Sequence, residues 1–210
     1  MRKLRRLEAA VILLCNYFTV VHIVVIVAAI VLPSGWWMKL SGAMFALYLF
    51  PPACFRVVGA MHRVKPGRMP VGSLDYFVWW FGFCSQNLYS RFPVFEELLR
   101  CIPGCYSVWL RLWGAKIGRL TYWCAGVRIY DRAYVSIGDH CRFGTDVRVM
   151  PHVHVGDELL LEPVVIEDDV VVGAYSLLTA GTVLKAGQST KAFLISPPGS
   201  VWQDNHRIAK

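Results

Sequence analysis

Two histidines near the middle of the chain, His152 and His154, have side chains suited to proton transfer. An imidazole has an ordinary pKa of about 6.5, so it can take up and release a proton near neutral pH. Because the two residues are two positions apart, a strand would place both on the same side. Two carboxylates, Asp131 and Glu162, could orient an imidazole or bind an amine. These residue types predict acid–base chemistry, with the carboxylates as substrate-binding residues.

The segment that holds these histidines repeats with a period of six residues. Six units begin with an apolar side chain, namely Ile137, Phe143, Val149, Ile166, Val172 and Leu178. The fifth position of these units holds Cys141, Val147, Val153, Val170, Ser176 and Thr182. Glycine follows the first residue at Gly138, Gly144 and Gly173. A short, regular period of this kind indicates a repeat architecture.

The repeat predicts a triangular coil in which each unit of six residues forms one side and three units complete a turn. The first residue of each unit points inward and stacks on its counterpart in the next coil. The small fifth residue fits at a corner, and glycine tolerates a close approach after the inward residue. A crossover between ordinary parallel strands needs about a dozen residues or more. Because this period leaves no room for one, we predict a parallel β solenoid over 116–195.

The repeat is interrupted between Val155 and Val165. The segment 156–163 must leave the coil as a loop, and both histidines lie immediately before it. Loops that project from a rigid scaffold commonly carry function. We therefore place the candidate site at the base of this loop. His140, in a tight turn of the coil, is interpreted as structural or as a subunit contact.

Three motifs in the sequence match a known family. Trp109 to Gly118 reads Trp-Leu-Arg-Leu-x-Gly-x-x-Ile-Gly, and Asp131 to Asp139 reads Asp-x-x-x-Val-x-Ile-Gly-Asp. The pair Pro151-His152 lies eleven residues before Pro163, which opens a Pro-Val-x-Ile segment. By these motifs, residues 70–195 resemble the hexapeptide-repeat acyltransferase superfamily. They are most similar to the membrane-associated C-terminal acyltransferase-like modules of ε-poly-L-lysine synthetase and related nonribosomal peptide synthetases.

The resemblance implies a left-handed parallel β-helix with acyltransferase activity. In that family an imidazole removes a proton from a hydroxyl or amine acceptor as the acceptor attacks a thioester. His152 matches this imidazole, and His154 is a second candidate for the base or a substrate ligand. The donor would be a phosphopantetheine thioester, from acyl-CoA or a carrier protein, with no bound cofactor and no metal. The resemblance also implies a homotrimer and a possible carrier protein or biosynthetic partner enzyme.

The N-terminal third is apolar enough to lie in a lipid bilayer. From Ala9 to Leu32 the chain has twenty-four residues without a charge, and a helix rising about 1.5 Å per residue would cross a layer of about 30 Å. An uncleaved helix over 9–32 is favoured over a signal peptide, because no small-residue cleavage site follows. A second segment, 40–58, either spans or re-enters, and Pro51-Pro52 should kink or break it.

The positive charge gathers at the flanks of these apolar segments. Residues 1–70 carry nine basic side chains against one acidic, whereas the rest of the chain has thirteen of each, for a net charge of +8. By the positive-inside rule, both outer flanks and all that follows lie on the cytoplasmic side of the inner membrane. This distribution favours lipid over nucleic acid as the partner. Asn16, Thr19 and His22 share one helix face, which would contact a second helix.

The sequence thus divides into an anchor (1–69), a helical connector (70–115), the β solenoid (116–195) and a tail (196–210). The aromatic connector suits helices in the bilayer interface, or its aromatic side chains could cap the coil. Seven cysteines without C-x-x-C spacing indicate a reduced compartment. Two alternative functions remain open: a non-catalytic membrane scaffold, and a zinc enzyme of the γ-carbonic-anhydrase type. The histidines at 140, 152 and 154 lack the spacing of the latter.

Overall fold

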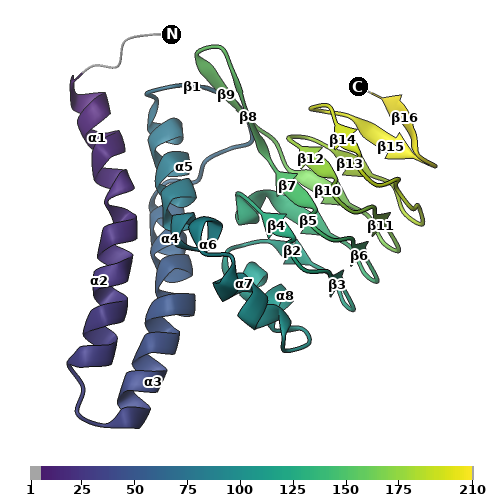
Figure 1. Cartoon of the computed structure of the whole chain (residues 1–210). Helices are drawn as coiled ribbons and strands as arrows, with labels where there is room; N and C mark the ends of the chain where they lie inside the picture. The colour runs from purple at the N-terminus through teal and green to yellow at the C-terminus, as the bar shows by residue number, and fades with distance from the viewer. Residues whose placement is uncertain (1–5, 210) are drawn as a thin grey trace. The chain divides into compact units, whose positions relative to one another are not determined.

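The computed structural model describes residues 6–209, and the chain divides into two compact units. The helical unit comprises Met1–Lys65 and Gly72–Arg91, and the solenoid unit comprises Pro66–Val71 and Phe92–Lys210. The division at Arg91 falls within the predicted connector. Figure 1 colours the chain by residue number, from purple at the N-terminus to yellow at the C-terminus.

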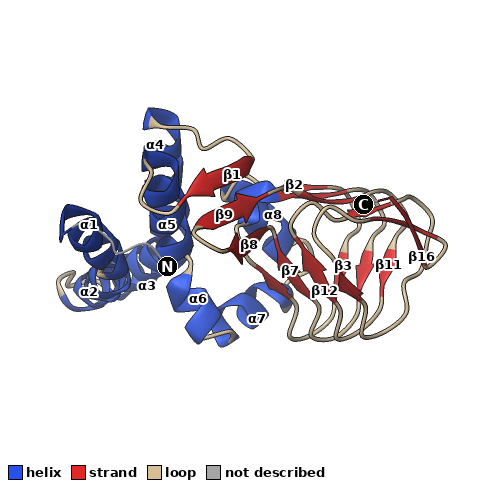
Figure 2. Cartoon of the chain, turned by 90° about the horizontal axis from the view of Figure 1, so that it is seen from above, coloured by secondary structure: helices blue, strands red, loops and turns tan. Residues whose placement is uncertain are grey.

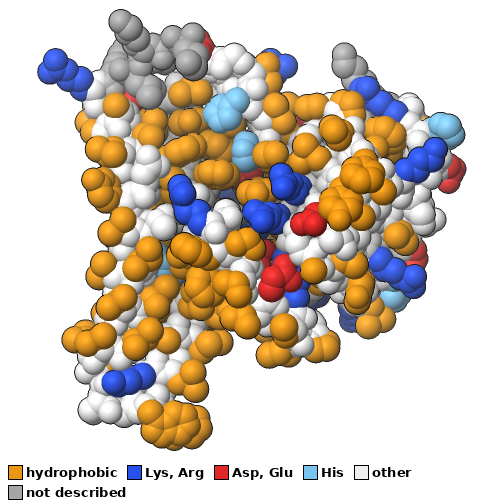
Figure 3. All heavy atoms as spheres, in the orientation of Figure 1, with side chains coloured by type: hydrophobic (Ala, Val, Ile, Leu, Met, Phe, Trp, Pro, Cys, Tyr) orange, Lys and Arg blue, Asp and Glu red, His pale blue; other side chains and the backbone are white. Residues whose placement is uncertain are grey.

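The helical unit is built on two long apolar helical segments joined by a short turn (Figure 1). The first contains α1 (Arg6–Asn16) and α2 (Phe18–Val31); the second contains α3 (Trp36–Met44), the π-helix η1 (Phe45–Leu49) and α4 (Phe50–Met61). The shorter α5 (Leu74–Ser85) and α6 (Asn87–Arg91) complete the unit. Arg6–Val31 and Trp36–Met61 each have 26 residues and are long and apolar enough to cross a membrane. Hydrophobic side chains cover most of the visible face of these two segments in Figure 3.

The second helical segment continues through Pro51 and Pro52, where the sequence predicts a kink or break. The π turn just before the prolines accommodates them, since the Phe50 N–H bonds to the Phe45 carbonyl five residues back. Proline has no N–H to donate, so helical carbonyls before it lose their usual partners. Two side chains from other helices take this role: His22 Nε2 bonds to the Ala46 carbonyl at 3.0 Å, and Tyr89 Oη donates to the Leu47 carbonyl.

The solenoid unit contains three parallel sheets, and each of the first three coils adds one strand to each sheet (Figure 2). One sheet pairs β2 (Lys116–Ile117), β5 (Val135–Ile137), β10 (Val164–Ile166), β13 (Val183–Leu184) and β15 (Val201–Gln203). The second pairs β3 (Tyr122–Trp123), β6 (Arg142–Phe143) and β11 (Val171–Val172). The third pairs β4 (Arg128–Ile129), β7 (Arg148–Met150), β12 (Leu177–Thr179) and β14 (Ile195–Ser196). This arrangement agrees with the predicted three-sided parallel coil.

The side chains predicted to point inward form the core of the solenoid. The first residues of all six predicted units are at most 3% exposed. Three glycines allow successive coils to approach, and a Cβ on Gly173 would lie 2.4 Å from the Lys191 carbonyl carbon. The fifth residues are also buried, with one exception: Val153 is partly exposed. Val153 differs because the chain has already left the coil at that point.

The interruption of the repeat leaves the coil, as predicted, and the loop is a β-hairpin. Strand β8 (His152–Val155) pairs antiparallel with β9 (Glu158–Leu161), and β9 pairs on its other edge with β1 (Gly67–Pro70). The six-residue unit predicted to run from Val149 to His154 therefore ends early, at Pro151. Its second half belongs to the hairpin because backbone pairing with β9 replaces pairing with the neighbouring coil.

Helices cover the first coil, and an antiparallel strand follows the last. Helix α8 (Cys105–Leu112) contacts β2, and its residue Trp109 is 3% exposed, while Trp113 just after it is fully buried. The short α7 (Val94–Arg100) packs on α8. At the other end β16 (His206–Ala209) pairs antiparallel with β15. A short 3₁₀ helix, η2 (Arg132–Tyr134), interrupts the coil at its first return corner.

Candidate active site

The candidate site lies at the corner where the third sheet returns to the first. In the first coil, β4 ends just before Asp131, whose backbone has a positive φ of 42°. In the second coil, β7 ends just before Pro151, and His152 opens the hairpin. Asp131 and His152 are therefore 21 residues apart in sequence but occupy the same corner of successive coils. An aspartate tolerates the left-handed backbone better than most residues, because its short polar side chain can bond locally.

The Asp131 carboxylate is hydrogen-bonded to the imidazole of His152, between Oδ2 and Nδ1. The side chains are largely buried, with 2% of Asp131 and 11% of His152 exposed. A neutral imidazole has one N–H and one acceptor nitrogen, and a carboxylate at Nδ1 selects the form with the proton on Nδ1. The Nε2 atom is then the nitrogen that can take a proton. The sequence grouped these two residues, but only the structure pairs them directly.

His154 lies on the same strand as His152, as the spacing predicts. The two ring centroids are 6.4 Å apart and the rings stand nearly perpendicular, at 80°. His154 is the more exposed of the two. Partial burial lowers the pKa of His154, and positive charge on His152 lowers it further. His154 therefore favours its neutral form, in which it can both donate and accept a hydrogen bond.

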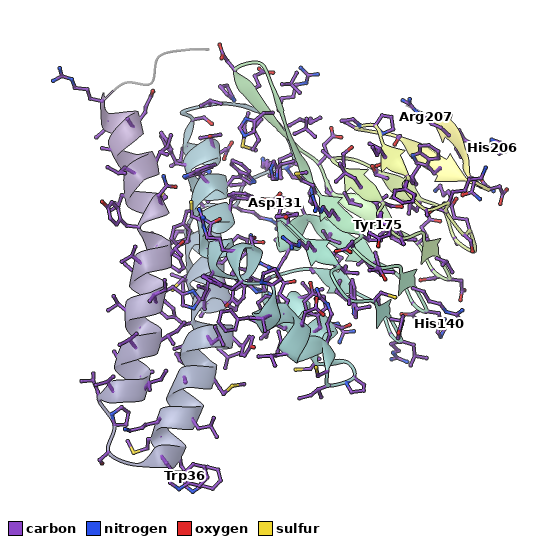
Figure 4. The ribbon with its side chains drawn as sticks, in the orientation of Figure 1. Trp36, Asp131, His140, Tyr175, His206 and Arg207 are labelled. Atoms are coloured by element: carbon purple, nitrogen blue, oxygen red, sulfur yellow. The ribbon has the colours of Figure 1, made fainter. Side chains whose placement is uncertain are left out.

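Glu162 approaches the coil that follows the hairpin, whereas Asp131 belongs to the coil before it. The Glu162 N–H donates to the Pro151 carbonyl at 2.9 Å, and the Glu162 carbonyl accepts from the Gly181 N–H at 3.2 Å. Its carboxylate lies against Gly181, where an added Cβ would be 2.3 Å from Oε2. The predicted carboxylates therefore flank the base of the hairpin from two successive coils. Figure 4 labels Asp131 in its place beside the hairpin.

A buried charged cluster next to this site was not predicted from the sequence. Arg132, directly after Asp131, bonds to Glu96 of α7 at 2.5 Å, and its side chain is 1% exposed. Glu96 Oε2 also accepts a hydrogen bond from Tyr106 Oη at 2.8 Å. Burial, and then the negative charge of Glu96, raise the pKa of Tyr106. The residues are far apart in sequence and follow no period, so spacing alone offered no signal for the cluster.

His140 lies at a different corner of the coil, away from the candidate site (Figure 4). Its imidazole is exposed and 3.4 Å from the carboxylate of Asp169 on the next coil. Its backbone is left-handed, with a φ of 56°. His140 therefore does not share a site with His152 and His154. Within residues 6–209, as the structure describes them, there is no group of three or more His, Cys, Asp or Glu side chains that could hold a metal ion.

The chain shows similarity to proteins of two kinds, although no family model matches it. In sequence it is 25% identical over 148 residues to the Delta-poly-L-ornithine synthetase of Acinetobacter baumannii (strain AB307-0294). The match covers 68% of this chain and 11% of that synthetase, so the chain spans about a ninth of its relative.

Among solved structures, it is similar to a hexapeptide-repeat-containing acetyltransferase from Vibrio cholerae O1 biovar eltor, complexed with acetyl coenzyme A. The identity is 19%, the TM-score 0.40, and the match covers 56% of this chain and 82% of the other. A galactoside acetyltransferase in complex with coenzyme A matches at 14% identity and a TM-score of 0.33, covering 51% and 74% of the two chains. The sequence match to a poly-L-ornithine synthetase agrees with the resemblance to poly-amino-acid synthetase modules that the sequence motifs suggested.

Proposed function

We propose that this protein is an acyltransferase that moves an acyl group from a phosphopantetheine thioester to a hydroxyl or amine acceptor, with His152 as the general base. The observation that carries the proposal is the Asp131–His152 pair at the hairpin base. A largely buried carboxylate bonded to Nδ1 orients an imidazole and stabilises the imidazolium that forms when Nε2 takes a proton. His152 also belongs to the Pro151-His152 motif, which is one of the motifs behind the family resemblance.

The transfer needs one proton cycle on His152. As the acceptor oxygen or nitrogen forms its bond to the thioester carbonyl carbon, its proton moves to His152 Nε2. The tetrahedral intermediate then collapses, the carbon–sulfur bond breaks, and the departing sulfur takes the proton back from the imidazolium. Acyl group, proton and charge balance, and His152 returns to its starting form. No metal ion is needed for this sequence of steps.

The residues around His152 bind the substrates or orient its imidazole. His154, in its neutral form, contacts the substrate beside His152 or acts as an alternative base. The Glu162 carboxylate binds an amine or hydroxyl acceptor from the side of the following coil. Asp131 orients the imidazole, which is one of the two roles that the sequence suggested for it beside substrate binding.

We also propose that this chemistry takes place at a membrane. We infer that Arg6–Val31 and Trp36–Met61 form a hairpin across the inner membrane, with the solenoid unit on the cytoplasmic side. Basic residues at both outer flanks support this orientation. By the family resemblance, we propose that the coil is left-handed, that the protein is a homotrimer, and that acyl-CoA or a carrier protein supplies the thioester.

The proposal is tested by thioester consumption with the full chain in detergent. His152→Ala should lower kcat by roughly 10²- to 10⁴-fold, the usual contribution of a general base. Asp131→Asn keeps the backbone conformation but removes the charge, and should lower kcat by roughly 10²-fold or more. The matched control is His206→Ala on the exposed β16, which should turn over normally.

Three outcomes would contradict the proposal. Normal turnover by His152→Ala would remove His152 from the chemistry. Failure of the wild-type protein to consume any of a mixed set of acyl thioesters, together with stable co-purification of an enzyme, would make it a membrane scaffold. Stoichiometric zinc in the purified protein would instead favour the γ-carbonic-anhydrase type of chemistry.

A further inference from the structure

Helix α7, which lies beside the first coil with α8 (Figure 1), buries two charged side chains while it exposes two aliphatic ones. Glu96 is 5% exposed, and the side chain of Arg100, which bonds to Glu96 at 3.1 Å, is 7% exposed. Val94 and Leu98 are 55% and 54% exposed, and because they are four residues apart they share one face of the helix. A helix at a water-exposed surface normally directs its charged side chains to the solvent and its aliphatic side chains to the core.

The exposed apolar side chains continue through the turn that follows α7 and into α8. Ile102 in the turn is 63% exposed, and Val108 in α8 is 52% exposed, whereas Trp109 beside it is buried. No charged residue lies between Arg100 and Arg111. The aromatic side chains of α8 therefore cap the coil, and aliphatic side chains of the two helices and their turn form a separate exposed surface. This aliphatic surface consists of Val94, Leu98, Ile102 and Val108.

The part of the chain around the aliphatic surface is basic. Between Glu97 and Asp131 it has five Lys or Arg residues and no Asp or Glu. Three of these cations are exposed, namely Arg111 in the last turn of α8, Lys116 and Arg119. Lys116 belongs to β2, which contacts α8, so the cations lie close to that helix. Exposed cations beside apolar side chains are attracted to the anionic surface of a lipid bilayer.

We propose that the aliphatic surface of α7 and α8 docks into the headgroup region of an anionic lipid bilayer, with Arg111, Lys116 and Arg119 near the lipid phosphates. Apolar side chains of interfacial helices enter this region to a depth of about 5–10 Å. A bilayer fits the surface better than a second copy of the chain, because a self-complementary contact would bring the same cations together. The inference rests on the proposed membrane location and not on the proposed chemistry. Docking would bring the solenoid unit to the surface where membrane-bound substrates lie.

The experiment detects contact with lipid directly, by NMR of labelled Ile, Leu and Val methyl groups in the full-length protein. The protein is placed in nanodiscs of phosphatidylcholine and phosphatidylglycerol in equal parts. A lipid with a nitroxide near the headgroup end of its acyl chain is added, because it broadens the signals of methyl groups close to it. Ile102, Leu98 and Val108 should lose their methyl signals. The matched control is Ile208 on β16, which is 56% exposed and should keep its signal.

Substitutions test the apolar and the charged parts of the surface separately. Ile102→Glu places a carboxylate in the aliphatic surface, so the methyl signals of Leu98 and Val108 should return. The matched control is Ile195→Glu on β14, where Ile195 is 69% exposed, and it should leave those signals lost. Lys116→Gln/Arg119→Gln should restore part of the signals, because it weakens the attraction to anionic lipid. Nanodiscs of phosphatidylcholine alone should do the same for the wild-type protein.

Ile30, which is 46% exposed near the end of α2, separates this inference from the proposed membrane location. Loss of the signal at Ile30 but not at Ile102 would overturn the docking surface alone. Loss at neither residue would overturn the membrane location and the docking together. If Ile102 is unaffected by the lipid nitroxide but protected from a water-soluble gadolinium chelate, protein covers the surface, and the proposal is again overturned. Thioester turnover plays no part in these measurements, so the proposed chemistry can fail while the docking stands.

Discussion

Buried polar groups in the helical unit and in the solenoid unit are satisfied in different ways. In the solenoid, the backbone of each coil bonds to the next coil through a regular parallel register. In the helical unit, single side chains such as His22 and Tyr89 bond to individual carbonyls beside Pro51 and Pro52. The repeated coil-to-coil bonding of the solenoid tolerates substitutions at the outer surface but not among the side chains that point inward. The bonding in the helical unit depends on a few individual side chains, and no other side chain repeats their contacts.

The largest expected effect distinguishes a side chain in the inner column of the solenoid from an exposed apolar side chain in the helical unit. Leu178 is fully buried in the solenoid, whereas Leu14 in the helical unit is 73% exposed. Leu178→Ala should lower the free energy of unfolding by about 2–5 kcal/mol, because it leaves a cavity between coils. Leu14→Ala should change it by about 0.5 kcal/mol or less. Denaturant unfolding followed by circular dichroism measures both, and equal effects would contradict the assigned core.

Replacing a glycine by alanine should change the stability of the protein in opposite directions in the two units. A Cβ on Gly173 would meet the backbone of the next coil, so Gly173→Ala should destabilise the protein by about 1–3 kcal/mol. Gly59 in α4 has nothing within 4 Å of an added Cβ. Gly59→Ala should stabilise the helix by about 0.5–1 kcal/mol. Thermal unfolding of the two variants side by side tests this, and a stabilised Gly173→Ala would refute the close packing of coils.

The bond from Tyr89 to the Leu47 carbonyl should depend on the missing N–H of Pro51. Tyr89→Phe should destabilise the helical unit by about 1 kcal/mol, because it leaves that carbonyl without its donor. Pro51→Ala restores a backbone N–H four residues after Leu47. A double-mutant cycle should therefore show a smaller loss for Tyr89→Phe in the Pro51→Ala background. If the two substitutions change the free energy of unfolding additively, this explanation of the π turn is wrong.

The smallest expected effect lies on the outer surface of the solenoid. Lys185 bonds to Glu167 of the preceding coil at 2.9 Å, and this hydrogen bond lowers the pKa of Glu167 below its ordinary value of 4.5. The stabilisation is present above that value and is lost as the pH falls through the folded-state pKa. Lys185→Met should cost about 0.5 kcal/mol at pH 7, because exposed pairs are weak. The difference from wild type should shrink below pH 4.5, and a difference that grows there would contradict this sign.

The solenoid was largely predictable from the sequence, and the candidate site only in part. Ile137 and Leu178 were placed in the core because a period of six reports which side chains turn inward. His152 and His154 were singled out because they lie where that period is interrupted, and the family resemblance favoured His152. Its direct bond to Asp131 was not foreseen, since nothing in the spacing distinguishes that carboxylate from Glu162 as the partner of the imidazole.

Features that depend on unrepeated contacts escaped the sequence analysis. The hairpin gains its outer strand from Gly67–Pro70, about ninety residues before β9. Arg132 bonds to Glu96, which lies on a separate helix.

By itself, the sequence determined the three-sided coil, its inward column and the two apolar helices, because a repeat contacts only its neighbours and a hydrophobic run needs no partner to be recognised. Only the tertiary structure decided that the interruption pairs as a hairpin, that Asp131 bonds His152 and that Glu96 bonds Arg132. Those contacts join distant residues once each. Such contacts produce no repeating pattern in the sequence, so the sequence alone could not predict them.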